Sequence, residues 1–146
     1  MKAGLCRYQA QWLTDLEIPL ANKFYRTHGF RGKAKRFEHC AVVRFEQSEL
    51  VACGYIRGCG NYRLLSGVAV APAHQNMGVA RRLLKLLSQK FDEKTYVFPY
   101  AYLHAFYESL GFYIVNSNDV TCEVQQRYLR FRDQGRNIII MAYRSE

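Results

Sequence analysis

The sequence has few of the features that mark disulfide-stabilised, metal-binding or membrane proteins. Its 146 residues include five cysteines, an odd number, and no C-x-x-C pair, so neither a disulfide framework nor a tetrahedral zinc site is indicated. No apolar run reaches the length of a membrane span, and the N-terminus lacks the long apolar stretch of a signal peptide. We therefore expect free thiols in a reducing compartment, the cytoplasm, with no metal and no membrane partner.

Acidic residues are also scarce. Twelve Asp and Glu stand against 21 Lys and Arg, which gives a formal net charge of +9. A charge of this sign favours anionic partners such as nucleic acid, a phosphorylated cofactor or an acidic protein, although solubility alone explains it equally well. The length suits a single domain over residues 1–146, and the apolar content of 49% is enough to fill its core.

Only three prolines interrupt the chain, and one of them lies in a helical pattern. A short strand is expected at residues 2–8 and a helix at residues 11–27. The apolar positions of this helix recur at three- and four-residue spacing: Leu13, Leu16, Leu20 and Phe24. Pro19 falls inside the pattern, so the helix should kink or split there.

The rest of the chain alternates between strand-like and helical patterns. Strands are expected at residues 39–45, 50–56, 63–70, 95–98, 112–115 and 137–143. Helices are expected at residues 78–91 and 101–110, and a helix or a long excursion at residues 122–132. A polar turn at residues 46–49 joins the first two of these strands into a hairpin. This order predicts a mixed α/β sheet, with antiparallel hairpins first and βαβ crossovers later.

The most informative stretch lies between the strand at 63–70 and the helix at 78–91. The strand ends close to Pro72, a short polar turn follows, and the helix opens at Gly78. Such a turn leaves backbone N–H groups unpaired at the positive end of a helix dipole, where they can bind phosphate. The alternative is an ordinary strand-to-helix turn.

Two basic segments contain interleaved aromatic residues, at 23–36 and 125–136. Basic residues mixed with aromatics suit nucleic-acid contact. No complete nucleic-acid-binding motif is present, however, so solvated charge around a site is the favoured interpretation.

Two motifs resemble signatures of the GNAT superfamily of acyl-CoA-dependent N-acyltransferases. Residues 75–80, QNMGVA, match the family's Q/R-x-x-G-x-G/A loop and follow the V-x-V-x-P strand end of Val68, Val70 and Pro72. Residues 107–112, YESLGF, are similar to the family's Y-E-x-x-G-F helix end. The resemblance covers residues 50–112 well and the flanks in outline.

The resemblance implies a mixed, mainly antiparallel central sheet flanked by helices, with a splayed central strand pair. It also implies an N-acetyltransferase that moves an acetyl group from acetyl-CoA to a primary amine of a small molecule or peptide. In this family the loop N–H groups hold the pyrophosphate and the strand edge holds the pantetheine arm. The implied cofactor contacts are Val68, Ala69, Val70, Gln75, Asn76, Met77, Gly78, Val79, Ala80 and Arg81.

Tyr107 matches the tyrosine that many relatives use as general acid at the departing sulfur, since a neutral phenol can protonate a thiolate. The alternative is a core tyrosine at the helix end. No carboxylate occurs in residues 63–70 or 95–99, so the general base is left open between His104, an ordered water and an amine that arrives deprotonated. Tyr100 stands where many relatives have asparagine.

The missing base keeps a second function open, a non-catalytic acyl-CoA-binding or nucleic-acid-binding module on the same fold. The two basic segments fall where the family shapes its acceptor site, so an anionic acceptor is a reasonable hypothesis. Both a monomer and a homodimer are compatible with the sequence.

Overall fold

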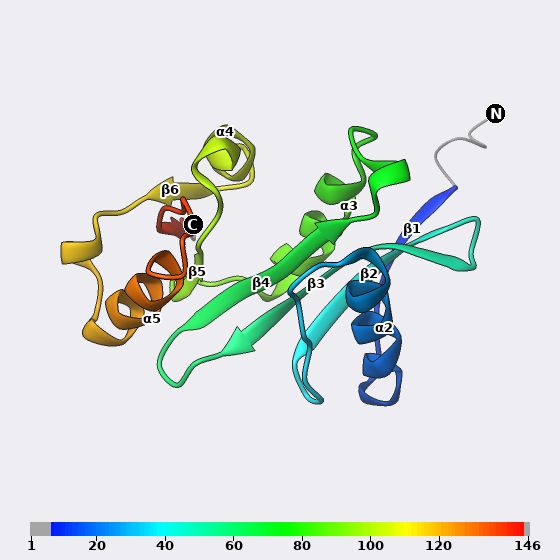
Figure 1. Ribbon diagram of the computed structural model, residues 1–146, viewed down its shortest axis with the longest axis horizontal. Helices are drawn as coiled ribbons and strands as arrows, with labels where there is room; N and C mark the ends of the chain where they lie inside the picture. Colours follow the sequence, from blue (N-terminus) through cyan, green and yellow to red (C-terminus); the bar gives the residue numbers. More distant parts are fainter. Residues whose placement is uncertain (1–6, 145–146) are drawn as a thin grey trace. The chain divides into compact units, whose positions relative to one another are not determined.

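A computed structural model describes residues 7–144, and their contacts divide them into two compact units (Figure 1). The first unit holds residues 7–57 and 65–90, and the second holds residues 58–64 and 91–144. Seven strands follow the order β1-β2-β3-β4-β5-β7-β6. The mixed, mainly antiparallel α/β class is thereby confirmed. The single domain and the splayed strand pair stay predictions.

The first unit contains most of four neighbouring strands, of which β2 is antiparallel to both β1 and β3. Their bounds are β1 (Tyr8–Trp12), β2 (His39–Phe45), β3 (Glu49–Gly58) and β4 (Arg63–Val70). Glu46 and Gln47 have positive φ values of 54° and 69°, which is the backbone of a type I′ hairpin turn. The expected hairpin is confirmed. The opening strand starts later than expected, and residues 2–6 of that prediction lie outside the described residues.

The helix expected at residues 11–27 is wrong in its first half. Residues 11 and 12 belong to β1, a short 3-10 turn spans Asp15–Glu17, and α2 covers Ile18–His28. Pro19 sits in the first turn of α2, where its missing N–H and fixed φ are harmless. Pro19 therefore starts this helix instead of kinking it.

Helices α2 and α3 (Val79–Leu87) cover opposite faces of the first-unit strands (Figure 1). Cys53 belongs to a buried cluster with Phe24 and Tyr25 of α2. The next residue, Gly54, faces the Leu83 and Leu87 side chains of α3. Successive residues of a strand point to opposite faces, so the two helices enclose the sheet between them. The expected helix at 78–91 is confirmed as α3 plus a 3-10 turn at Ser88–Lys90.

The second unit contains three short strands and two helices. Their bounds are β5 (Thr95–Val97), α4 (His104–Glu108), β6 (Phe112–Ile114), α5 (Cys122–Arg132) and β7 (Met141–Tyr143). Strand β7 lies between β5 and β6 and is antiparallel to both. Helix α5 has the predicted bounds. Residues 101–110 form a 3-10 turn followed by α4, and the expected last strand is reduced to β7 and an isolated bridge of Tyr100 with Ile138.

Two leucines that the sequence placed on one helical face have opposite environments, which gives a direct test of the fold. Leu13 is 8% exposed and Leu16 is 83% exposed. We expect Leu13→Ala to lower the free energy of unfolding by about 2–4 kcal/mol, because it leaves a cavity. Leu16→Ala, the matched control, should change it by less than about 0.5 kcal/mol. Urea unfolding of the two variants measures both values, and equal losses would contradict this arrangement.

Candidate functional site

The turn from β4 into α3 has an unusual backbone path. Gln75 braces it, because its side-chain Nε2 donates to the carbonyl of Val70 at 3.0 Å. Asn76 and Gly78 both have left-handed backbone conformations, with φ values of 64° and 78°. Left-handed residues alternating with others turn successive N–H groups toward a common point. The turn therefore forms a concave row of donors at the start of α3.

These donors have no partner within the part of the chain that the structure describes. The first bond of α3 runs from the N–H of Arg82 to the carbonyl of Gly78 at 3.2 Å. Of the earlier N–H groups, those of Met77, Gly78, Val79 and Ala80 reach no described acceptor, and no side chain caps the helix. A Cβ placed on Gly78 would meet nothing within 4 Å. Four donors without a described acceptor thus lie at the positive end of a helix dipole, an arrangement suited to an anion.

Side chains from β1 and β2 support this turn from behind. The Tyr8 hydroxyl lies 2.9 Å from Nδ1 of His74 and donates to Sδ of Met77 at 3.3 Å. The Phe45 ring contacts both the Tyr8 and His74 rings, with centroids 5.1 Å and 4.9 Å apart. The sequence analysis missed Tyr8 and His74. No local pattern could reveal them, because Tyr8 and His74 are 66 positions apart in the chain.

Basic side chains follow the donor row on α3. Arg81 and Lys85 are exposed and Arg82 is half-buried. Their charge adds to the positive potential at the start of the helix and favours a phosphorylated ligand. Arg81 also has an interaction within the protein.

Strand β4 has an irregular backbone at Gly67, just before Val68, Ala69 and Val70, and we refer to this irregularity as the β4 bulge. Gly67 lies inside the strand with a φ of +64°, a conformation that favours glycine and marks an irregular strand. Its carbonyl accepts a hydrogen bond from the Tyr25 hydroxyl at 2.7 Å. An isolated glycine in a strand pattern is a signal for a bulge, so Gly67 could have been identified from the sequence, whereas Tyr25 could not.

Tyr107 belongs to the second unit, whereas the donor row belongs to the first. Its side chain is 4% exposed, and its ring contacts Phe106 and Phe112 with centroids 5.2 Å and 5.9 Å away. Burial raises the pKa of Tyr107 well above its usual value, because the charged phenolate is disfavoured in an apolar environment. The group is therefore a neutral phenol that keeps its proton over the physiological range.

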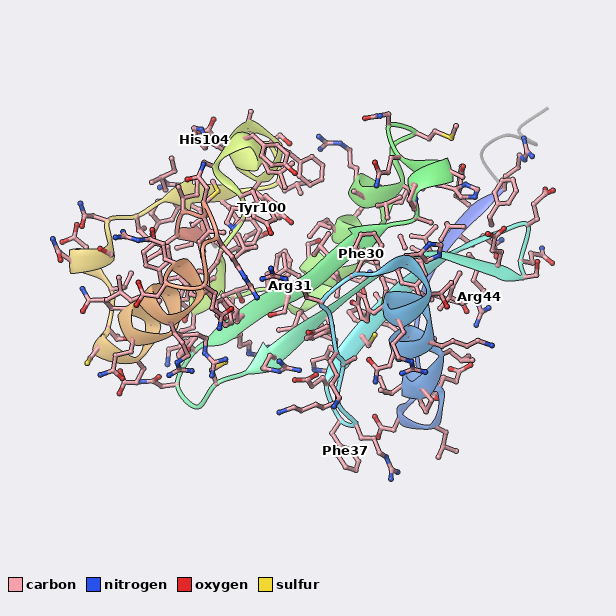
Figure 2. All side chains as sticks on the ribbon, viewed as in Figure 1. Phe30, Arg31, Phe37, Arg44, Tyr100 and His104 are labelled. Atoms are coloured by element: carbon pink, nitrogen blue, oxygen red, sulfur yellow. The ribbon has the colours of Figure 1, made fainter. Side chains whose placement is uncertain are left out.

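His104, one candidate for the base, has a surface environment. Its Nε2 lies 3.4 Å from a carboxylate oxygen of Glu108 one turn later in α4. Both side chains are substantially exposed, at 41% and 62%. Tyr100 stacks on Tyr102 with centroids 6.0 Å apart, and Figure 2 labels Tyr100 and His104 on the chain around α4. These contacts favour a surface role for His104.

Most arginines of the basic segment at 125–136 contact aromatic side chains of the protein itself. Arg127 donates to the Tyr62 hydroxyl at 2.7 Å. The guanidinium groups of Arg132 and Arg136 lie over the rings of Tyr128 and Phe131 at 5.9 Å and 4.8 Å. Such contacts account for the interleaved aromatics as local packing.

The other basic segment comprises the end of α2 and most of the loop between α2 and β2. This loop is held by contacts at several points. Asn22 exchanges two hydrogen bonds with the backbone of Ala34. Arg57 pairs with Glu38 at 2.7 Å and donates to the carbonyl of Lys33. Figure 2 shows Phe37 at the tip of the loop, directed away from the ribbon. The loop is thus ordered by its own contacts, with an aromatic tip that is 78% exposed.

Residues 7–144 offer few other kinds of site. No group of three or more His, Cys, Asp or Glu side chains gathers there in a way that would hold a metal ion. In the same residues, no helix is both long and apolar enough to cross a bilayer. The donor row at residues 77–80 is therefore the site with the clearest ligand chemistry.

Several solved structures share this fold. Rv2747 from Mycobacterium tuberculosis, in complex with CoA, matches with a TM-score of 0.69 and 15% identity over 94% of this chain and 99% of its own. The ribosomal-protein-S18-alanine N-acetyltransferase from Escherichia coli matches with a TM-score of 0.64 and 20% identity over 93% of this chain and 92% of its own. N-acetylglutamate synthase from Neisseria gonorrhoeae, complexed with coenzyme A and N-acetyl-glutamate, matches with a TM-score of 0.65 and 14% identity over 95% of this chain.

The match to the synthase is partial, since this chain spans 35% of its length. No curated protein matches the sequence significantly. The family model described as the acetyltransferase (GNAT) domain matches residues 36–114, more than half of the 146-residue chain. The matched segment contains the β4 bulge, the donor row and Tyr107. The chain therefore belongs to the GNAT family of acetyltransferases.

Proposed function

We propose that this protein transfers an acetyl group from acetyl-CoA directly to the primary amine of a small molecule or peptide. The single observation that carries the proposal is the row of four unpartnered N–H groups at residues 77–80. Coenzyme A supplies the ligand that such a row requires, because its pyrophosphate is a compact anion with several acceptor oxygens. The backbone of Val68, Ala69 and Val70 would bind the pantetheine arm as an added strand.

Tyr107 is the proposed general acid. Attack of the amine on the thioester breaks the carbon–sulfur bond, and the departing thiolate takes a proton from the phenol. Because burial raises the pKa of Tyr107, the proton needed for this step stays in place throughout the neutral range. The acceptor amine enters as the neutral nucleophile or loses its proton to water, since His104 is paired with Glu108 at the surface.

The acceptor and the location of the protein are further parts of the proposal. One structural neighbour is named with N-acetyl-glutamate and another with an alanine of a ribosomal protein. In both cases the amine lies near a carboxylate or a peptide group. The net charge of +9 is compatible with an anionic acceptor. The buried thiols of Cys40 and Cys53 share a hydrogen bond at 3.8 Å and form no disulfide, which suits a reducing compartment such as the cytoplasm.

A substitution at Gly78 tests the donor row. Gly78→Ala adds a methyl group where the pyrophosphate would lie and forces alanine into a left-handed conformation, which costs about 1–2 kcal/mol. We expect the Kd of coenzyme A, measured by calorimetry, to rise at least about tenfold, since the anion contacts are lost. Gly60→Ala is the matched control, because Gly60 also has a positive φ, of +80°, and open space around it. An unchanged Kd in Gly78→Ala, or an equal loss in Gly60→Ala, would contradict the site.

A substitution at Tyr107 tests the general acid. Tyr107→Phe should lower kcat by about a hundredfold or more and leave the Kd of acetyl-CoA nearly unchanged, because only proton transfer is removed. Because the pKa of Tyr107 is raised, activity that requires the protonated phenol should persist through pH 10. It should be lost only as the pH rises through the raised pKa. A kcat profile for the wild type that declines through a tyrosine ionising below pH 10 would refute the assignment.

Release of coenzyme A separates a transferase from a module that only binds acyl-CoA. We expect wild-type protein to release free thiol from acetyl-CoA in the presence of a panel of amino acids, peptides and polyamines, and to acetylate at least one of them. Tight acetyl-CoA binding with no thiol release on any amine would favour the binding module. Mass spectrometry of the amines provides the independent readout.

A further inference from the structure

Tyr25 makes a long-range contact with β4, the strand that would bind the pantetheine arm. It lies on α2 with 1% of its surface exposed. Its hydroxyl donates to the carbonyl of Gly67 at 2.7 Å, across 42 positions of sequence. Burial and the neighbouring thiol of Cys53 raise the pKa of Tyr25, so the hydroxyl keeps its proton and remains a donor.

The bond fixes more than one atom, because Gly67 shares its peptide group with Val68. A trans peptide is planar, and its C=O and N–H point in opposite directions. A hydroxyl that holds the Gly67 carbonyl toward α2 therefore directs the Val68 N–H away from α2. Val68 is the first of the three β4 residues that would face the acyl-CoA arm, so the orientation of this peptide bears on the thioester end of the ligand.

The rings around Gly67 leave the peptide little freedom. A Cβ at Gly67 would overlap the Tyr55 ring and lie 2.6 Å from the Tyr25 hydroxyl oxygen. The Tyr25 and Tyr55 rings pack edge to face, with centroids 6.1 Å apart. The bulge is therefore fastened from behind by two tyrosines, of which only Tyr25 bonds to the Gly67 carbonyl.

The loop between α2 and β2 holds the two tyrosines in turn. The Tyr55 hydroxyl accepts the N–H of Lys33 at 3.1 Å. Gly32 packs directly on the Tyr25 ring, where a Cβ would collide with it. The loop, the two tyrosine rings and the β4 bulge thus form one continuous set of contacts within the first unit. Of the two tyrosines, Tyr25 forms the hydrogen bond to β4.

We propose that Tyr25 is a positioning residue for acetyl transfer, whose hydroxyl orients the Gly67–Val68 peptide so that the Val68 N–H polarises the thioester carbonyl of bound acetyl-CoA. This proposal rests on the proposed function, because it requires acetyl-CoA to lie along β4. The N–H lowers the energy of the oxyanion that develops on that oxygen during attack by the amine. Tyr25 itself exchanges no proton with the substrate.

The test is an infrared spectrum of the complex, with acetyl-CoA carrying an isotope-labelled carbonyl carbon. A hydrogen bond to the carbonyl lowers its stretching frequency, so we expect the band in the wild-type complex to lie below that of free acetyl-CoA. In Tyr25→Phe, which removes only the hydroxyl, the band should return at least half-way to the free value. The Kd of acetyl-CoA should change by less than about threefold, because the pyrophosphate contacts remain.

Thr95→Val is the control for a general loss of stability. Thr95 is fully buried and its hydroxyl is hydrogen-bonded to Asp92, so this variant also removes a buried hydroxyl, but in the second unit. It should lower Tm and leave the carbonyl band at the wild-type position. A merely structural role for Tyr25 predicts instead that both variants lower Tm and neither moves the band.

The outcomes separate this proposal from the proposed function. If the wild type binds acetyl-CoA and Tyr25→Phe leaves the carbonyl band unmoved, the positioning role is overturned while acetyl transfer stands. If the band moves as expected but no amine is acetylated, Tyr25 still orients the peptide that contacts the thioester carbonyl, but acetyl transfer, and with it a role of Tyr25 in that reaction, is overturned. If acetyl-CoA does not bind the wild type, both are overturned.

Discussion

Four backbone N–H groups at the start of α3 have no acceptor in the described protein, and this unmet hydrogen bonding is the constraint around which the first unit is organised. The first N–H groups of a helix are left for side chains, water or ligands to satisfy, so a fold that gathers such donors in one place is suited to bind an anionic ligand. The left-handed conformations of Asn76 and Gly78 create the row, and the open space before Gly78 leaves room for the ligand.

Both sides of the first-unit sheet contribute to holding this arrangement. On one side, Leu83 and Leu87 pack α3 against Gly54 and fix the direction of the helix dipole. On the other side, Tyr25 of α2 holds the Gly67 carbonyl in the β4 bulge. The pyrophosphate end and the thioester end of an extended ligand would thus be set by different elements. Because different elements set the two ends, a substitution at Gly78 is expected to change the Kd of coenzyme A, and one at Tyr25 the carbonyl stretching band.

The sequence predicted best those features that depend on neighbouring residues. The bounds of β2, β4 and α5 follow from local patterns, and the turn before α3 follows from its glycine and its motif. The helix at residues 11–27 failed because Leu16 fits the helical spacing but is exposed. Tyr8 and Tyr25 were beyond prediction, since each acts on a partner more than 40 positions away.

The central claim is that the N–H groups of residues 77–80 bind the pyrophosphate of coenzyme A, and amide NMR tests it directly. Titration with coenzyme A should move the amide protons of Met77, Gly78, Val79 and Ala80 downfield, because each gains a charge-assisted hydrogen bond. Pantetheine, which lacks the phosphates, should leave these four signals in place while perturbing β4. If coenzyme A leaves the four amides unmoved, or pantetheine shifts them equally, the account is contradicted.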